Sequence, residues 1–105
     1  MGVGGGGQEL APHVQVSTLT ATGAGAAIGL CGDFNASVWG SFVATVQLER
    51  SFDGGTNWLP CTRAGVPVAF SLPFTDVVSE PEAGVLYRLN CTSYTSGTAH
   101  VRLSQ

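Results

Sequence analysis

The sequence predicts an all-β protein, an antiparallel β-sandwich or jelly roll of about eight short strands. Runs in which apolar and polar residues alternate recur along the chain, and turn residues separate them roughly every 8 to 12 positions. No segment of ten residues keeps the apolar period of roughly 3.6 residues that an amphipathic helix needs. These observations favour a sandwich or barrel of short strands over a helical fold.

The first half of the chain contains the clearest strand. Residues 13–22 are rich in β-prone residues, whereas the small, apolar residues 24–30 fit either a strand or a loop. Alternation resumes over residues 34–39. It is strictest over residues 42–50, where apolar side chains occupy the even positions up to Leu48. This segment is expected to be a strand with one buried face.

The second half of the chain predicts five further strands. They span residues 58–62, 66–72, 74–79, 85–91 and 99–103. Pro67 has no backbone N–H to donate, so the second of these strands is an edge strand or begins after the proline. Two hairpins, over residues 43–62 and 85–104, are expected, and they favour an antiparallel meander.

A distinctive motif, Ser51-Phe-Asp-Gly-Gly-Thr-Asn-Trp58, connects two of these strands. Gly55 and the glycine before it tolerate positive φ, as a tight hairpin turn requires. Asp53 is expected to accept hydrogen bonds from the backbone two residues further on. The spacing of Ser51, Asp53, Gly55 and Trp58 resembles the Asp-box hairpin of sialidases and other β-proteins, which implies a folding element without a catalytic role.

The composition points to a subunit of an assembly. The chain has 105 residues, the size of one domain, and only 10% of them are charged, against about 25% in typical soluble domains. Its four basic residues are all arginines, and lysine is the residue type most depleted at protein interfaces. Compositional drift in a GC-rich genome is the alternative explanation. The net charge of −3, without a basic cluster, argues against nucleic-acid binding, and no apolar run approaches the length of a membrane span.

The glycine-rich residues 1–12 form an expected N-terminal arm before a single domain over residues 13–105. The consecutive glycines Gly4, Gly5, Gly6 and Gly7 lose much conformational entropy when they are ordered. We therefore expect this arm to be ordered only by contact with another subunit. The arm lacks the basic and apolar regions of a signal peptide.

The three cysteines are expected to be reduced and buried. Cys31, Cys61 and Cys91 are odd in number, so a disulfide framework would leave one of them free. Each stands in an apolar or alternating context, where free cysteine behaves as a small hydrophobic residue. Reduced thiols fit assembly in a reducing host cytoplasm.

No catalytic or cofactor-binding motif stands out, so the chain is predicted not to be an enzyme and to need no metal or cofactor. His13 and His100 lie in expected strands without a nucleophile nearby in sequence and are interpreted as surface or interface residues. Glu80 and Glu82 flank a proline, and solvated turn charge is a simpler interpretation than a glycosidase pair. The cysteine spacing does not match a zinc site.

Trp39 is the aromatic residue singled out as a candidate interface anchor. It alternates with the apolar positions of residues 34–38, so it is expected to face away from the core. An outward tryptophan suggests a subunit contact or a ligand platform. Together with Trp58, Tyr87 and Tyr94, it could instead contribute to a sugar-binding face.

Three segments resemble small β-sandwich virion proteins of tailed bacteriophages, namely residues 35–40, 46–58 and 80–89. The resemblance implies a structural protein of the virion. The leading interpretation is a head decoration (cement) protein on the capsid surface, which binds the major capsid protein as a homotrimer and stabilises the shell. The alternative is a carbohydrate- or receptor-binding module of a tail fibre or spike.

Overall fold

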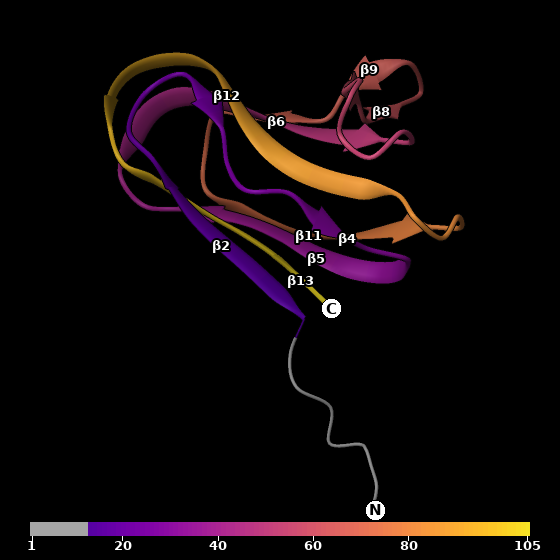
Figure 1. Ribbon diagram of the computed structural model, residues 1–105. Helices are drawn as coiled ribbons and strands as arrows, with labels where there is room; N and C mark the ends of the chain where they lie inside the picture. The colour runs from indigo at the N-terminus through magenta and orange to yellow at the C-terminus, as the bar shows by residue number, and fades with distance from the viewer. Residues whose placement is uncertain (1–12) are drawn as a thin grey trace, which may run out of the picture.

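The chain folds into two antiparallel sheets that face each other, as a computed structural model covering residues 13–105 shows (Figure 1). The described residues contain strands and turns and no helix, so the predicted all-β class is confirmed. The jelly-roll variant stays a prediction. The predicted arm, including Gly4 to Gly7, lies outside the described residues.

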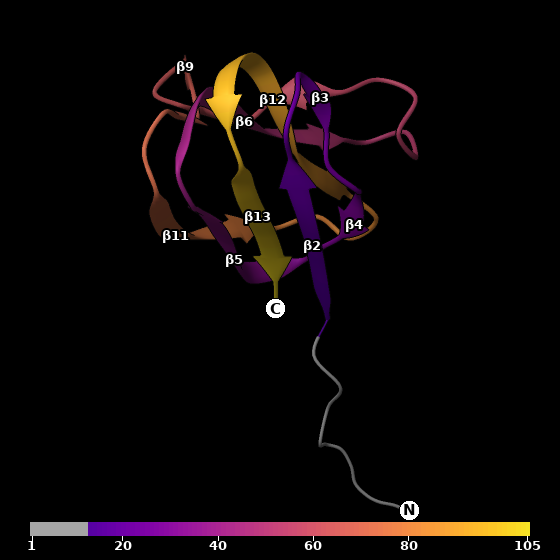
Figure 2. The ribbon, with the colours of Figure 1, turned by 90° about the vertical axis from the view of Figure 1, so that its left-hand side faces the viewer.

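One layer is a four-stranded sheet with the order β11-β5-β13-β2. Its strands are β2 (Val14–Leu19), β5 (Gly32–Trp39), β11 (Phe74–Glu80) and β13 (Ala99–Ser104). All neighbours in this sheet are antiparallel, and Figure 2 shows β13 between β2 and β5. The C-terminus ends beside the start of β2, where His13 and Gln105 exchange two backbone hydrogen bonds.

The second layer has two long central strands and interrupted edges. β6 (Phe42–Ser51) pairs with β12 (Leu86–Gly97) along most of its length. Two short strands pair with β12 on the side away from β6, and two others pair with β6 on the side away from β12. Because each pair of short strands occupies one edge, this sheet is also four strands wide. The short strands are β3 (Gly23–Ala24) and β4 (Ile28–Gly29) beside β12, and β7 (Leu59–Pro60) and β10 (Ala69–Phe70) beside β6.

A small flap projects from the β6 edge between β7 and β10. It consists of β8 (Thr62–Arg63) and β9 (Val66–Pro67), which pair only with each other (Figure 1). Pro67 therefore lies outside the two main sheets, so its missing N–H removes no hydrogen bond from their ladders. At the base of the flap, Cys61 and Val68 continue the hydrogen bonding to Leu48 of β6.

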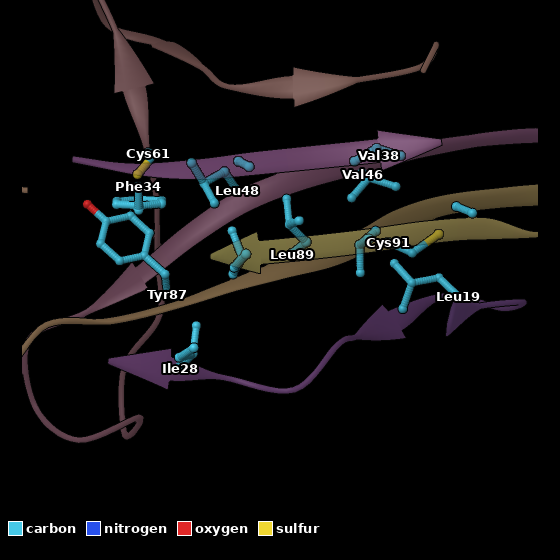
Figure 3. Close-up of a cluster of buried hydrophobic side chains, with 14 of the residues drawn as sticks. Leu19, Ile28, Phe34, Val38, Val46, Leu48, Cys61, Tyr87, Leu89 and Cys91 are labelled. Carbon is cyan, nitrogen blue, oxygen red and sulfur yellow. The ribbon is translucent and has the colours of Figure 1, made fainter. Parts of the chain in front are cut away.

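The core fills the space between the layers. Side chains of β5 such as Phe34 and Val38 meet Leu48 of β6 and Leu89 of β12, and all four are almost fully buried (Figure 3). The rings of Phe34 and Tyr87 pack across the layers with their centroids 4.6 Å apart. Burying a side chain of this size contributes roughly 1.5–3 kcal/mol. The alternation of apolar and polar residues in β5 and β6 places such side chains on one face of each strand, and their burial between the layers stabilises the sandwich.

The predicted hairpin over residues 85–104 is wrong. β12 pairs with β6, whereas β13 pairs with β2 and β5 in the opposite sheet. The register of β12 shifts twice near its end, and such irregularities bend a strand. Gly97 has φ +88°, and a Cβ there would collide with the carbonyl oxygen of Ser41. The chain therefore crosses between sheets at Gly97 instead of folding back on itself.

The expectation that all three cysteines are buried is wrong for Cys31. All three thiols are free, and Cys61 and Cys91 are buried, but Cys31 is exposed. Cys31 lies in the connection between β4 and β5, directly after the buried Leu30. Because Leu30 takes the inward position, its neighbour faces the solvent.

The interpretation of Glu80 as a solvated turn residue is also wrong. Glu80 is the last residue of β11 and is only 1% exposed. Its carboxylate accepts hydrogen bonds from the Tyr87 hydroxyl (2.6 Å), Arg50 Nη1 (2.8 Å) and the backbone N–H of Glu82 (3.0 Å). We call Glu80, Arg50 and Tyr87 the Glu80 cluster; it joins β11 of one sheet to β6 and β12 of the other.

The Glu80 cluster shifts the ionisation of its members. Burial alone would raise the pKa of Glu80, but the three hydrogen bonds and the Arg50 charge outweigh it and hold that pKa below its usual value. Burial and the hydrogen bond to Glu80 raise the pKa of Tyr87. At neutral pH the cluster therefore contains an ionised carboxylate that accepts a hydrogen bond from the hydroxyl of a neutral tyrosine.

The substitution Tyr87→Phe tests the contribution of the cluster. It keeps the ring against Phe34 but removes one donor from a buried carboxylate, so we expect a loss on the order of 1–3 kcal/mol in the free energy of unfolding. The control is Tyr94→Phe, because the partly exposed Tyr94 donates only to the backbone oxygen of Gly97. Chemical denaturation of both variants measures the difference, and equal losses would contradict a special role for Glu80.

Candidate functional site: the outer face of the four-stranded sheet

The Asp-box-like motif forms the turn between β6 and β7. Ser51 Oγ accepts a hydrogen bond from the N–H of Gly55 (2.9 Å) and donates one to Asp53 Oδ1 (2.7 Å). Asp53 accepts from the backbone N–H and the side-chain amide of Asn57, four residues on instead of the expected two. Gly55 has φ +96°, a backbone conformation that glycine adopts without strain and that this turn requires. All of these hydrogen bonds lie within the motif, which therefore stabilises its own turn.

Trp58 is held against the outer face of the β6–β12 sheet. The guanidinium of Arg88 lies 4.2 Å from the centre of its ring, and Arg88 also pairs with Glu49 at 2.8 Å. Glu49 accepts further hydrogen bonds from Gln47 and Asn90. Polar groups on this outer face therefore satisfy one another, and Trp58 anchors the hairpin to them.

Trp39 occupies a different position. It ends β5 with its side chain on the outer face of the four-stranded sheet, where it is 42% exposed. Its ring stacks on that of His100 in β13, with the centroids 5.6 Å apart and an interplanar angle of 20°. The predicted outward orientation of Trp39 agrees with this placement. The stack presents a flat, rigid aromatic surface.

The outer face of the four-stranded sheet carries little charge. Residues on it, by strand alternation and exposure, are Val16, Thr18, Asp33, Asn35, Ser37, Trp39, Thr75, Val77, Ser79, His100 and Arg102. The formal charges are Asp33, near one end, and Arg102, in the middle. Val16 and Val77 are 52% and 60% exposed, and they extend the apolar surface to both edges of the sheet. We call this surface the sheet face.

The other aromatic and histidine candidates do not join the sheet face, apart from His100. Tyr87 is buried in the core, and the Tyr94 hydroxyl donates to the Gly97 backbone. His13 is exposed, with Nε2 2.7 Å from the carbonyl oxygen of Gly29. A row of outward aromatic residues is therefore not assembled, and the platform consists of one tryptophan and one imidazole.

Sequence reasoning did not single out Val16 and Val77. Both stand in alternating runs whose apolar residues could be expected to face the core. Their orientation depends on the register with β13 and β5, which pairs Val16 with Arg102 and Val77 with Asn35. Only the pairing of the strands identifies these valines as part of an exposed surface.

The described residues contain neither a metal-binding cluster nor a membrane-spanning helix. Within residues 13–105, no three His, Cys, Asp or Glu side chains gather in a way that could hold a metal ion. The same part of the chain has no helix long and apolar enough to cross a membrane.

Comparison with known proteins gives no match: no family model, no curated protein and no solved structure is significantly similar to this chain.

The turn motif predicts a pH-dependent contribution to stability. Hydrogen bonds from the Asn57 backbone, the Ser51 hydroxyl and the Asn57 side chain lower the pKa of Asp53 to about 2. Because this value lies below that of the unfolded chain, the ionised Asp53 stabilises the fold at neutral pH, and this contribution is lost as the pH falls towards 2. Asp53→Asn should therefore lower the melting temperature near pH 7 and have a much smaller effect near pH 2.

Thermal unfolding between pH 7 and pH 2 measures this difference, with Asp33→Asn as the control. Asp33 is also exposed, but its carboxylate accepts none of the hydrogen bonds found among the described residues. A melting-temperature gap between wild type and Asp53→Asn that is equally large at both ends of the range would contradict the argument.

Proposed function

We propose that this protein is a decoration protein of a tailed bacteriophage head and binds the outer surface of the capsid through the sheet face. The observation that carries the proposal is the exposed Trp39–His100 stack on a sheet surface that has few charges. The resemblance of residues 35–40, 46–58 and 80–89 to phage virion proteins supplies the biological context. Residues 35–39 belong to β5, at the centre of the sheet face.

The physical argument concerns desolvation. Removing charged side chains from water is costly unless they are paired, whereas the hydroxyls and apolar groups of the sheet face lose little on burial. Ser37 and Thr75 already hydrogen bond to each other at 2.8 Å, which further lowers the cost of covering them. Interfaces are enriched in tryptophan and depleted in lysine, and this chain contains no lysine.

The proposed partner is the major capsid protein, and the proposed state is a homotrimer on the virion surface. A single sheet face of this size offers a small contact area. Three linked subunits bind far more tightly than one, because each binding event raises the effective concentration of the next. Asp33 and Arg102, the two charges of the sheet face, would then orient the subunit without dominating its affinity.

The second candidate is a carbohydrate- or receptor-binding module of a tail fibre or spike. The same Trp39–His100 stack favours it, since a flat aromatic surface can pack against a sugar ring. The two candidates differ in partner and in copy number. Glycan-array binding that depends on Trp39 would support the tail module and contradict the decoration role.

The substitution Trp39→Ala tests the proposed contact. It should weaken binding to heads that lack the protein by about 2 kcal/mol or more, roughly a thirtyfold loss of affinity, as buried aromatic anchors do. The free domain should remain folded, because Trp39 lies outside the core. The measurement is copy number per head by quantitative gel, together with the heat and chelator resistance of the heads.

Phe52→Ala is the matched control for Trp39→Ala. Phe52 is an aromatic residue of similar exposure, 47%, but it lies in the β6–β7 turn beside Arg50, away from the sheet face. Its loss should leave occupancy unchanged. Equal occupancy of the Trp39→Ala and wild-type proteins, or heads that are fully stable without the protein, would rule out the proposed role.

A further inference from the structure

A cavity of about 280 Å³ opens at the edge of the sandwich, between the flap and β11. The residues that line it include the apolar Leu48 and Val68 and the polar Thr62 and Ser79. The cavity is near the lower size limit of small-molecule sites, which start at roughly 300 Å³. Figure 3 shows Cys61 and Tyr87, two further lining residues, at the same end of the core.

Two arginines line the cavity. Arg50 and Arg63 both line it, and they are two of only four basic residues in a chain with a net charge of −3. No carboxylate of residues 13–105 is among the lining groups. The other two arginines are elsewhere: Arg88 covers Trp58, and Arg102 lies on the sheet face.

Both lining arginines are held in place by carboxylates outside the cavity. Arg50 Nη1 lies 2.8 Å from Glu80 Oε1, and Arg63 Nη2 lies 2.7 Å from Asp76 Oδ2. Each of these contacts uses one nitrogen of a guanidinium that has five N–H donors. These ion pairs leave further N–H donors on each guanidinium, and they restrict the side chains before a ligand binds, which reduces the entropy lost on binding.

We propose that this cavity is a binding site for a carboxylate group, held between Arg50 and Arg63. Guanidinium groups bind planar carboxylates through paired N–H donors. The apolar wall at Leu48 and Val68 suits a ligand with a small hydrocarbon body. The carboxylate belongs either to a free small molecule or to an acidic side chain of a protein partner. The two guanidinium groups that define the site lie outside the sheet face, although Val77 lines the cavity and also belongs to the edge of that face.

The flap supports this assignment. Arg63 belongs to β8, and its contact with Asp76 ties the flap to β11. The flap turns through Ala64 and Gly65, both with positive φ, which is the conformation of a tight two-residue hairpin. The β8–β9 hairpin thus contributes little to the core but positions one of the two guanidinium groups.

The test is a titration of the full chain followed by NMR of the arginine Nε–H groups, with benzoate as the probe and benzamide as its neutral counterpart. Benzoate should shift the signals of Arg50 and Arg63 and leave those of Arg88 and Arg102 unchanged. Arg63→Gln should weaken benzoate binding about tenfold, as the loss of a charge-assisted hydrogen bond does. Arg102→Gln is the matched control and should bind like wild type.

Arg50 is left intact in this design because its substitution would also disturb the Glu80 cluster. Equal binding of benzamide and benzoate, uniform shifts of all four arginines, or no shift at all would overturn the proposal. A second titration compares the blocked peptides Gly-Glu-Gly and Gly-Gln-Gly. Binding of the glutamate peptide alone assigns the site to a partner's acidic side chain, whereas binding of benzoate without either peptide assigns it to a free small carboxylate.

Discussion

The buried carboxylate of Glu80 is the constraint on which the architecture depends. A charge that is removed from water must be compensated by donors in fixed positions, or the fold that buries it is strongly destabilised. Here the donors come from Tyr87 and Arg50 in one sheet, while Glu80 itself ends β11 in the other. The cluster therefore links the layers at one end of the sandwich and penalises any shift of β11 along β5.

This constraint also shapes the distribution of charge on the surface. Arg50 is committed to Glu80, Arg63 to Asp76, and Arg88 to Glu49 and Trp58. In a chain without lysine, Arg102 is then the only basic residue left for the sheet face. Charge gathers at the flap and on the outer face of the β6–β12 sheet. The sheet face, in contrast, is left with the Trp39–His100 stack, hydroxyls and exposed valines.

Much of the fold could be predicted from local patterns. Alternation in residues 34–39 and 42–50 predicted two core strands and the outward Trp39, because the side-chain period of a strand is two regardless of its partner. The turn residues from Ser51 to Trp58 identified the β6–β7 hairpin. These features depend on short-range geometry, which a single sequence encodes directly.

The errors concern relations between distant segments. The hairpin over residues 85–104 was inferred from two adjacent alternating runs, but β12 bends and crosses to the other sheet at Gly97. Glu80 looked like a turn residue because Pro81 follows it, and its donors Arg50 and Tyr87 come from two other strands. The cavity between Arg50 and Arg63 likewise exists only once β11 and the flap are placed together.

The most direct test of the central claim, that the sheet face is the surface by which the protein binds a phage head, is a cryo-electron microscopy reconstruction of particles that contain the protein. The proposed role predicts sandwich-shaped density in many copies on the capsid, as trimers, with β5 and β13 against the shell and Trp39 in the contact. Density only at the tail, or a head-bound sandwich with the Trp39–His100 stack facing solvent, would contradict it.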